Sequence, residues 1–145
     1  MFVLLRMAST SPALARRVGD EPGALAALVA AAAAGDAAAA PSLQRLAATS
    51  ADVLSRVASA SPELTHSMAE VPGGLSALVA AVAAGTAAAA ANLQDRAANS
   101  TQVLAHAASA SPDLAKRVAK APGALPTLIA AVAAGRAARA PGSLL

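Results

Sequence analysis

The chain has 145 residues and a formal net charge of +3, and it contains no Cys, Trp or Tyr and a single Phe. The lack of Cys excludes disulfide scaffolds, zinc ribbons and thiol catalysis. The near-absence of aromatic rings argues against base-stacking folds such as the RRM and the OB-fold. Hydrophobic residues make up 57% of the chain, but 48 residues are Ala, so 18 Leu and 11 Val supply most of the large apolar side chains. That is enough for a thin layered core and too little for a thick globular one.

The sequence repeats with a period of 50 residues and no gaps. The segment 11–35 returns at 61–85 and at 111–135 with the same Ser-Pro, Pro-Gly and Leu-x-x-Leu positions. A fixed period of this length is typical of stacked structural repeats. We therefore predict a single α-helical repeat domain over 1–145, with the units 1–50, 51–100 and 101–145.

The ends of the array carry no polar capping unit, although stacked arrays need such caps. We therefore expect either a piece of a longer array or a chain whose ends are covered by partners. The first 17 residues hold arginines and no acids, as a mitochondrial presequence does. Because these arginines occupy repeat positions, we interpret the segment as part of the first unit.

Each unit reads as helices separated by short breaks. A Ser-Pro pair predicts a helix start, because the Ser hydroxyl can accept an amide hydrogen of the first turn. Pro fits the first helical position, because the N–H that it lacks would have no partner within the helix. A Pro-Gly pair then ends this short helix and opens the next. The following Gly is expected to end that second helix in the left-handed region. The Ser-Pro pairs begin at Ser11, Ser61 and Ser111, the Pro-Gly pairs are 22–23, 72–73 and 122–123, and the closing glycines are Gly35, Gly85 and Gly135.

Two further helices are predicted in the rest of the unit. Residues 87–98 read as a third, Ala-rich helix, and Ser50 and Ser100 are expected to cap a fourth. No stretch alternates with a period of two, so strands are not expected. Four short helices cannot bury their apolar faces alone, and stacking the units would bury them. The predicted core is the apolar stripe of the second helix, namely Leu25, Leu28, Val29, Leu75, Leu78, Val79, Val82, Leu125, Leu128, Ile129 and Val132.

The segments 23–35, 73–85 and 123–135 share a Gly-[Ala/Gly]-Leu-x-x-Leu-[Val/Ile] pattern followed by Ala and Gly. This pattern resembles the third helix of Ala-rich armadillo-type repeats. The resemblance implies an all-α fold, a right-handed α-solenoid of about three 50-residue units. A leucine-rich-repeat-variant solenoid is the alternative, because the unit is longer than an armadillo unit. The Asn and Trp ladder of peptide-binding armadillo grooves is missing, so importin-like peptide capture is not implied.

No pattern in the sequence predicts catalysis, and no cofactor or metal is expected. The two histidines occupy basic repeat positions, since His66 aligns with Arg16 and Lys116, and His106 aligns with Arg6 and Arg56. The serines lack a Gly-x-Ser-x-Gly elbow. The stretch 71–94 is uncharged, but it contains Pro and Gly and is rich in Ala, so we expect no membrane span. No pattern in the sequence predicts a small-molecule substrate either.

Basic side chains recur at equivalent positions and form a candidate binding surface. Residues 101–145 hold five basic residues and one acid, whereas 51–100 hold two and four. We hypothesise that the last unit faces an acidic surface, of protein or of phosphate. The expected function is a non-enzymatic scaffold that binds protein partners in a larger, intracellular assembly, and the alternative is a nucleic-acid-associated subunit of an RNA–protein particle. The candidate contacts are Arg6, Arg16, Arg17, Arg56, His66, His106, Lys116, Arg117, Lys120, Arg136 and Arg139.

Overall fold

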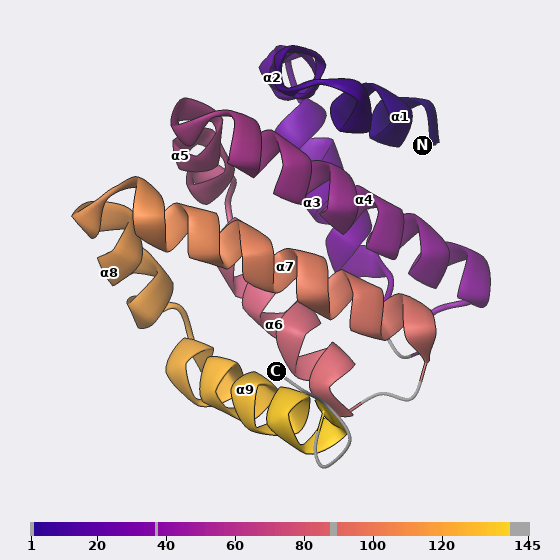
Figure 1. Ribbon diagram of the computed structural model, residues 1–145, viewed down its shortest axis with the longest axis vertical. Helices are drawn as coiled ribbons and strands as arrows, with labels where there is room; N and C mark the ends of the chain where they lie inside the picture. The colour runs from indigo at the N-terminus through magenta and orange to yellow at the C-terminus, as the bar shows by residue number, and fades with distance from the viewer. Residues whose placement is uncertain (1, 37, 88–89, 140–145) are drawn as a thin grey trace.

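The computed structural model describes residues 2–36, 38–87 and 90–139, and the side chains of residues 2, 86–87 and 134–139 lie outside this description. The described residues are helical apart from short connections, which confirms the predicted all-α class (Figure 1). The helices are α1 (Phe2–Thr10), α2 (Pro12–Asp20), α3 (Ala24–Ala34), α4 (Pro41–Ala60), α5 (Pro62–Glu70), α6 (Gly74–Ala87), α7 (Ala91–Ala110), α8 (Pro112–Lys120) and α9 (Ala124–Arg139).

The predicted starts and breaks of the short helices are confirmed. Ser11, Ser61 and Ser111 each precede a helix with Pro at its first position, and each side chain accepts the amide hydrogen three residues ahead at 3.1–3.2 Å. The turn after each of these helices contains a Pro-Gly pair. Its glycine has a positive φ of 70–79° in all three units, a conformation that side chains with a Cβ disfavour.

The prediction of four helices per unit is wrong, because the third and fourth helices are one. α4 and α7 are each 20 residues long and run through Ser50 and Ser100 without interruption. No Pro or Gly lies between 42 and 60 or between 91 and 110, so nothing breaks the helix. The Ser50 hydroxyl donates to the Leu46 carbonyl at 2.7 Å, one turn back within the helix, and caps nothing.

Gly35, Gly85 and Gly135 differ from their predicted role. Gly35 follows the end of α3, but its φ is −93°, and α6 and α9 continue past Gly85 and Gly135. A Cβ on Gly85 would overlap the Ala97 methyl and lie 2.5 Å from the Leu93 carbonyl oxygen, and one on Gly35 would meet Ala47 in the same way. These two glycines therefore allow close helix contact rather than a left-handed turn.

Equivalent helices of successive units pack against one another. α1, α4 and α7 form one row, α3 and α6 pack side by side behind it, and α9 packs on α6 at the lower end of the molecule (Figure 1). Each long helix also packs on the helix that precedes it, α4 on α3 and α7 on α6. α1 with α2 and α9 lie at opposite ends of the longest axis of the molecule (Figure 1).

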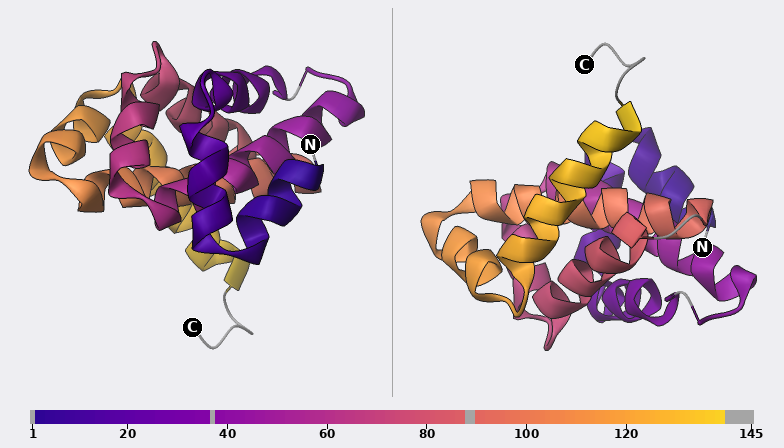
Figure 2. Two further views of the ribbon diagram at one scale, coloured as in Figure 1. Left: turned by 90° about the horizontal axis from the view of Figure 1, so that it is seen from above. Right: turned by 90° about the horizontal axis from the view of Figure 1, so that it is seen from below.

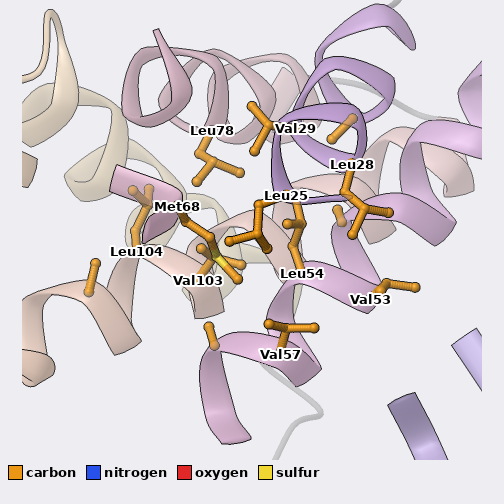
Figure 3. Packing of buried hydrophobic residues seen from close by; sticks show 14 of the residues in the cluster. Leu25, Leu28, Val29, Val53, Leu54, Val57, Met68, Leu78, Val103 and Leu104 are labelled. Carbon is orange, nitrogen blue, oxygen red and sulfur yellow. The ribbon is translucent and has the colours of Figure 1, made fainter. Parts of the chain in front are cut away.

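The core lies between the two rows of helices. Six of the predicted core residues are buried, with the α3 and α6 stripes meeting side chains of α4, α5 and α7 that were not predicted (Figure 3). The confirmed residues are Leu25, Leu28, Val29, Leu78, Val79 and Val82, and the additional ones include Val53, Leu54, Val57, Met68, Val103 and Leu104.

The predicted core is wrong for the last unit. Leu125, Ile129 and Val132 on α9 are 55%, 69% and 63% exposed, and Leu128 on the same helix is half-buried. Leu75 on α6 is also half-buried. In the first two units, the long helix that follows in sequence packs on the stripe, α4 on α3 and α7 on α6. Among the described residues no long helix follows α9, so its stripe faces outward.

No single described helix is long and apolar enough to span a membrane. The pair Pro62–Glu70 and Gly74–Gly85 meets the length and hydropathy criterion together, with a bend of 93° between its two helices.

Candidate functional site

An open groove of about 550 Å³ crosses three helices of the front row, α1, α4 and α7, and the start of α2. One stripe of polar side chains from each long helix lines it. On α4 the stripe has the spacing i, i+3, i+4, i+7, and on α7 it has i, i+3, i+7, so each occupies one helix face. The polar lining residues on the two helices are Asp52, Ser55, Arg56, Ser59, Asn99, Gln102 and His106.

The opposite face of the same helices explains the position of the groove. Val53, Leu54 and Val57 alternate with the polar residues of α4 and are fully buried. Burial of this apolar face fixes the rotation of α4, and the polar stripe is consequently turned away from the core.

Hydrogen bonds hold part of the groove lining in place. The Arg56 Nε lies 3.0 Å from the Asp52 Oδ1, which pairs the two charges on one helix turn. The Ser55 hydroxyl donates to the Gln102 Oε1 at 2.7 Å, joining α4 to α7. This bond uses the oxygen of the Gln102 amide, whose NH₂ group is a hydrogen-bond donor.

The groove contains both hydrogen-bond donors and hydrogen-bond acceptors. In the described part of the chain, no hydrogen bond joins a Ser hydroxyl to His66 or His106, as a nucleophile and its base would require. Nor do three or more His, Cys, Asp or Glu side chains gather there in a way that suits a metal ion.

The predicted basic residues do not form one site. Arg56 and His106 line the groove, whereas Arg6 borders an apolar hollow on α1. Arg16 on α2 pairs with Glu63 on α5 at 3.5 Å, and both side chains are exposed.

Arg117 on α8 bridges to the preceding unit. Its guanidinium lies 2.8 Å from the Glu70 carboxylate and donates to the Ala69 carbonyl at 2.9 Å. Arg117 and Lys120 border a hollow of about 290 Å³ beside the turn between α5 and α6. Two of the predicted contact residues, Arg16 and Arg117, therefore link one unit to the next.

The remaining predicted contacts are scattered. Arg17, His66 and Lys116 are exposed on α2, α5 and α8. Arg136 and Arg139 belong to the last turns of α9, and their side chains lie outside the described part of the structure.

Arg96 is a buried cation that the sequence analysis missed. It is 2% exposed, its Nη1 donates to the Ala32 carbonyl near the end of α3 at 2.9 Å, and its buried Nε has no partner among the described residues. Burial lowers the pKa of the Arg96 guanidinium, and the carboxylate of Asp36 opposes that shift. The signal was available, because the repeat aligns Arg96 with Leu46 on an inward-facing position.

No family model, curated protein or solved structure matches this chain. The internal repeat and the geometry of the groove therefore carry the functional argument.

Proposed function

We propose that this chain is a non-enzymatic helical-repeat scaffold, an armadillo-like right-handed α-solenoid, whose groove holds an extended polypeptide segment of a partner. The observation that carries the proposal is the origin of the lining, since α1, α4 and α7 are equivalent helices of successive repeats and build the groove together. Helical-repeat proteins bind partners on surfaces that neighbouring units form jointly.

The chemistry of the lining suits a polypeptide backbone. Each residue of an extended chain offers one N–H donor and one C=O acceptor. The groove presents amide groups from Asn99 and Gln102, a hydroxyl from Ser59 and the carboxylate of Asp52. Because Asp52 neutralises Arg56 at 3.0 Å, the groove selects by shape and hydrogen bonding more than by net charge.

Binding of nucleic acid or of an acidic protein surface by the basic face is the second candidate. The exposure of Lys116 and Lys120 on α8, in a unit with five basic residues and one acid, favours it. The ion pairs of Arg16 and Arg117 weigh against it, because each places a carboxylate within the proposed basic surface. Affinity of this kind would fall steeply with rising salt.

Site-specific photo-crosslinking tests the groove directly. A benzoylphenylalanine placed at His106 lies in the groove, and one placed at the exposed Ala30 of α3 is the matched control outside it. The proposal predicts protease-sensitive crosslinked products in cell extract from position 106 and few from position 30. Equal labelling at both positions, or products that only nuclease removes, would contradict it.

A further inference from the structure

The apolar stripe of α9 is exposed, whereas the equivalent stripe of α3 is buried. Leu125, Ile129 and Val132 are 55%, 69% and 63% exposed. Their counterparts on α3 are Leu25, Val29 and Ala32, at 8%, 5% and 2%. The three positions follow i, i+4, i+7 spacing and therefore form one stripe along the helix. Viewed from below, α9 lies nearest to the viewer and uncovered by other described helices (Figure 2, right).

At the opposite end of the molecule, α1 exposes a second apolar face. Val3 on α1 is 71% exposed, whereas its counterparts Val53 on α4 and Val103 on α7 are 0% and 1% exposed. An open apolar hollow of about 620 Å³ lies beside it, lined by Val3, Leu5, Arg6, Met7 and Ser9. Seen from above, α1 and α2 lie on the near side at this end (Figure 2, left).

The repeat explains why these two faces correspond. α4 packs on α3 and α7 packs on α6, so a helix of the α3 type is covered by the long helix that comes next. Within the described residues, α9 has no such helix after it. α1 aligns with the second half of α4 and α7, residues 52–60 and 102–110, and among the described helices none of the α3 type packs on it.

We propose that a second copy of this chain covers α9, with the α1 face of one copy seated on the α9 face of another in a head-to-tail contact. The α9–α1 pair would repeat the kind of packing that α6 makes on α7 within the chain. Such a contact is heterologous, so it leaves one free α1 face and one free α9 face and continues into longer assemblies unless a ring closes.

Charge shapes the expected salt dependence. The last unit holds five basic residues and one acid, and the first holds four basic and three acidic residues, so both end units are positive. Apolar burial has to overcome this repulsion. Salt screens the repulsion, and we therefore expect association to strengthen as salt rises, opposite to binding of nucleic acid. A contact between two single helices is expected to bury on the order of 1,000 Å² or less, so we expect weak association that is followed up to millimolar protein.

Sedimentation velocity on the full chain and two exposed-site variants tests the proposal. Val3→Glu places a charge in the apolar face of α1, and Ile129→Glu places one in the apolar face of α9. Ala26→Glu at an exposed position of α3 is the control for the added charge. The parent and the control should show a mean mass that rises with concentration. Each face variant alone should remain at the mass of one chain, with unchanged helicity by circular dichroism.

The mixture of the two face variants is the decisive sample. Ile129→Glu keeps an intact α1 face and Val3→Glu keeps an intact α9 face, so an equimolar mixture should form a species of two chains and stop there. A parent that stays at one chain up to millimolar concentration would overturn the proposal. A dimer formed by Val3→Glu alone would overturn it too, since it indicates a symmetric α9–α9 contact. The groove crosslinks from position 106 are independent of both outcomes.

Discussion

Arg96 shows how one side chain joins elements that are 64 positions apart in the chain. Arg96 is buried where the repeat places the half-buried Leu46 in the first unit, and its guanidinium donates to a carbonyl near the negative end of α3. The buried Nε has no partner, which offsets part of that gain.

Replacing Arg96 separates its packing role from its charge. Arg96→Leu restores the residue type of the first unit, and buried charges replaced by apolar groups of similar volume often leave stability unchanged or raise it. Arg96→Ala removes the packing as well and should lower the free energy of unfolding by about 2–4 kcal/mol. Urea unfolding followed by circular dichroism measures both. A Leu variant as unstable as the Ala variant would show that the hydrogen bond to Ala32 dominates.

Gly85 should respond to substitution against the usual helix trend. In an exposed helical position, Ala is more stable than Gly by about 1 kcal/mol. At Gly85 a Cβ would overlap Ala97, and we expect Gly85→Ala to destabilise the fold by about 1–3 kcal/mol. Ala80→Gly, an exposed position of the same helix, is the control and should cost about 1 kcal/mol. A stabilised Gly85→Ala protein would contradict the close contact of α6 with α7.

At the scale of the helices, local sequence signals predicted the starts of α2, α5 and α8 and the turns that follow them. The Ser-Pro caps and Pro-Gly turns are found where expected, because they act on their own amides and φ angles. The prediction failed where neighbours decide. Ser50 resembles a cap but lies within α4, and Gly85 resembles a helix end but serves a contact with α7.

The α5 cap gives a measurable contribution at this scale. The Ser61 hydroxyl accepts the Leu64 amide hydrogen at 3.2 Å in a buried position. Ser61→Ala should lower the free energy of unfolding by about 0.5–2 kcal/mol. Ser59→Ala, an exposed position near the end of α4, should change it by less than about 0.5 kcal/mol. Equal effects at the two sites would contradict the capping role.

The apolar stripes of α6 and α9 should differ in their contribution to stability although their sequences are similar. Leu78 is 2% exposed and Leu125 is 55% exposed. Leu78→Ala should cost about 2–5 kcal/mol, and Leu125→Ala less than about 1 kcal/mol at low protein concentration. Thermal unfolding of both variants checks this difference, and a large loss from Leu125→Ala in dilute monomer would show that α9 is packed against other parts of the chain.

At the scale of the whole molecule, the repeat predicted which basic positions are equivalent but not how their side chains pair. The comparison of equivalent positions, 50 residues apart, did not include side chains that are 47 residues apart. Arg16–Glu63, Ser55–Gln102 and Arg117–Glu70 are each separated by 47 residues, and each joins one unit to the next. A sequence search for complementary side chains at this separation would have found these links.

We propose that the groove, and not the basic face, binds the partner. Calorimetric titration of the crosslinked partner, once purified, tests it with three proteins across a salt series. They are the parent, Asn99→Ala/Gln102→Ala in the groove, and Lys116→Gln/Arg117→Gln/Lys120→Gln on α8. The groove variant loses the Ser55–Gln102 bond and the α8 variant loses the Arg117–Glu70 pair, each at a cost of about 1–3 kcal/mol, and circular dichroism checks that all three proteins fold. We predict at least about a tenfold loss of affinity for the groove variant, equivalent to about 1.4 kcal/mol, and little change for the α8 variant at any salt concentration. An unchanged groove variant, together with an α8 variant that binds weakly and loses the salt dependence of the parent, would contradict the account and assign binding to the basic face.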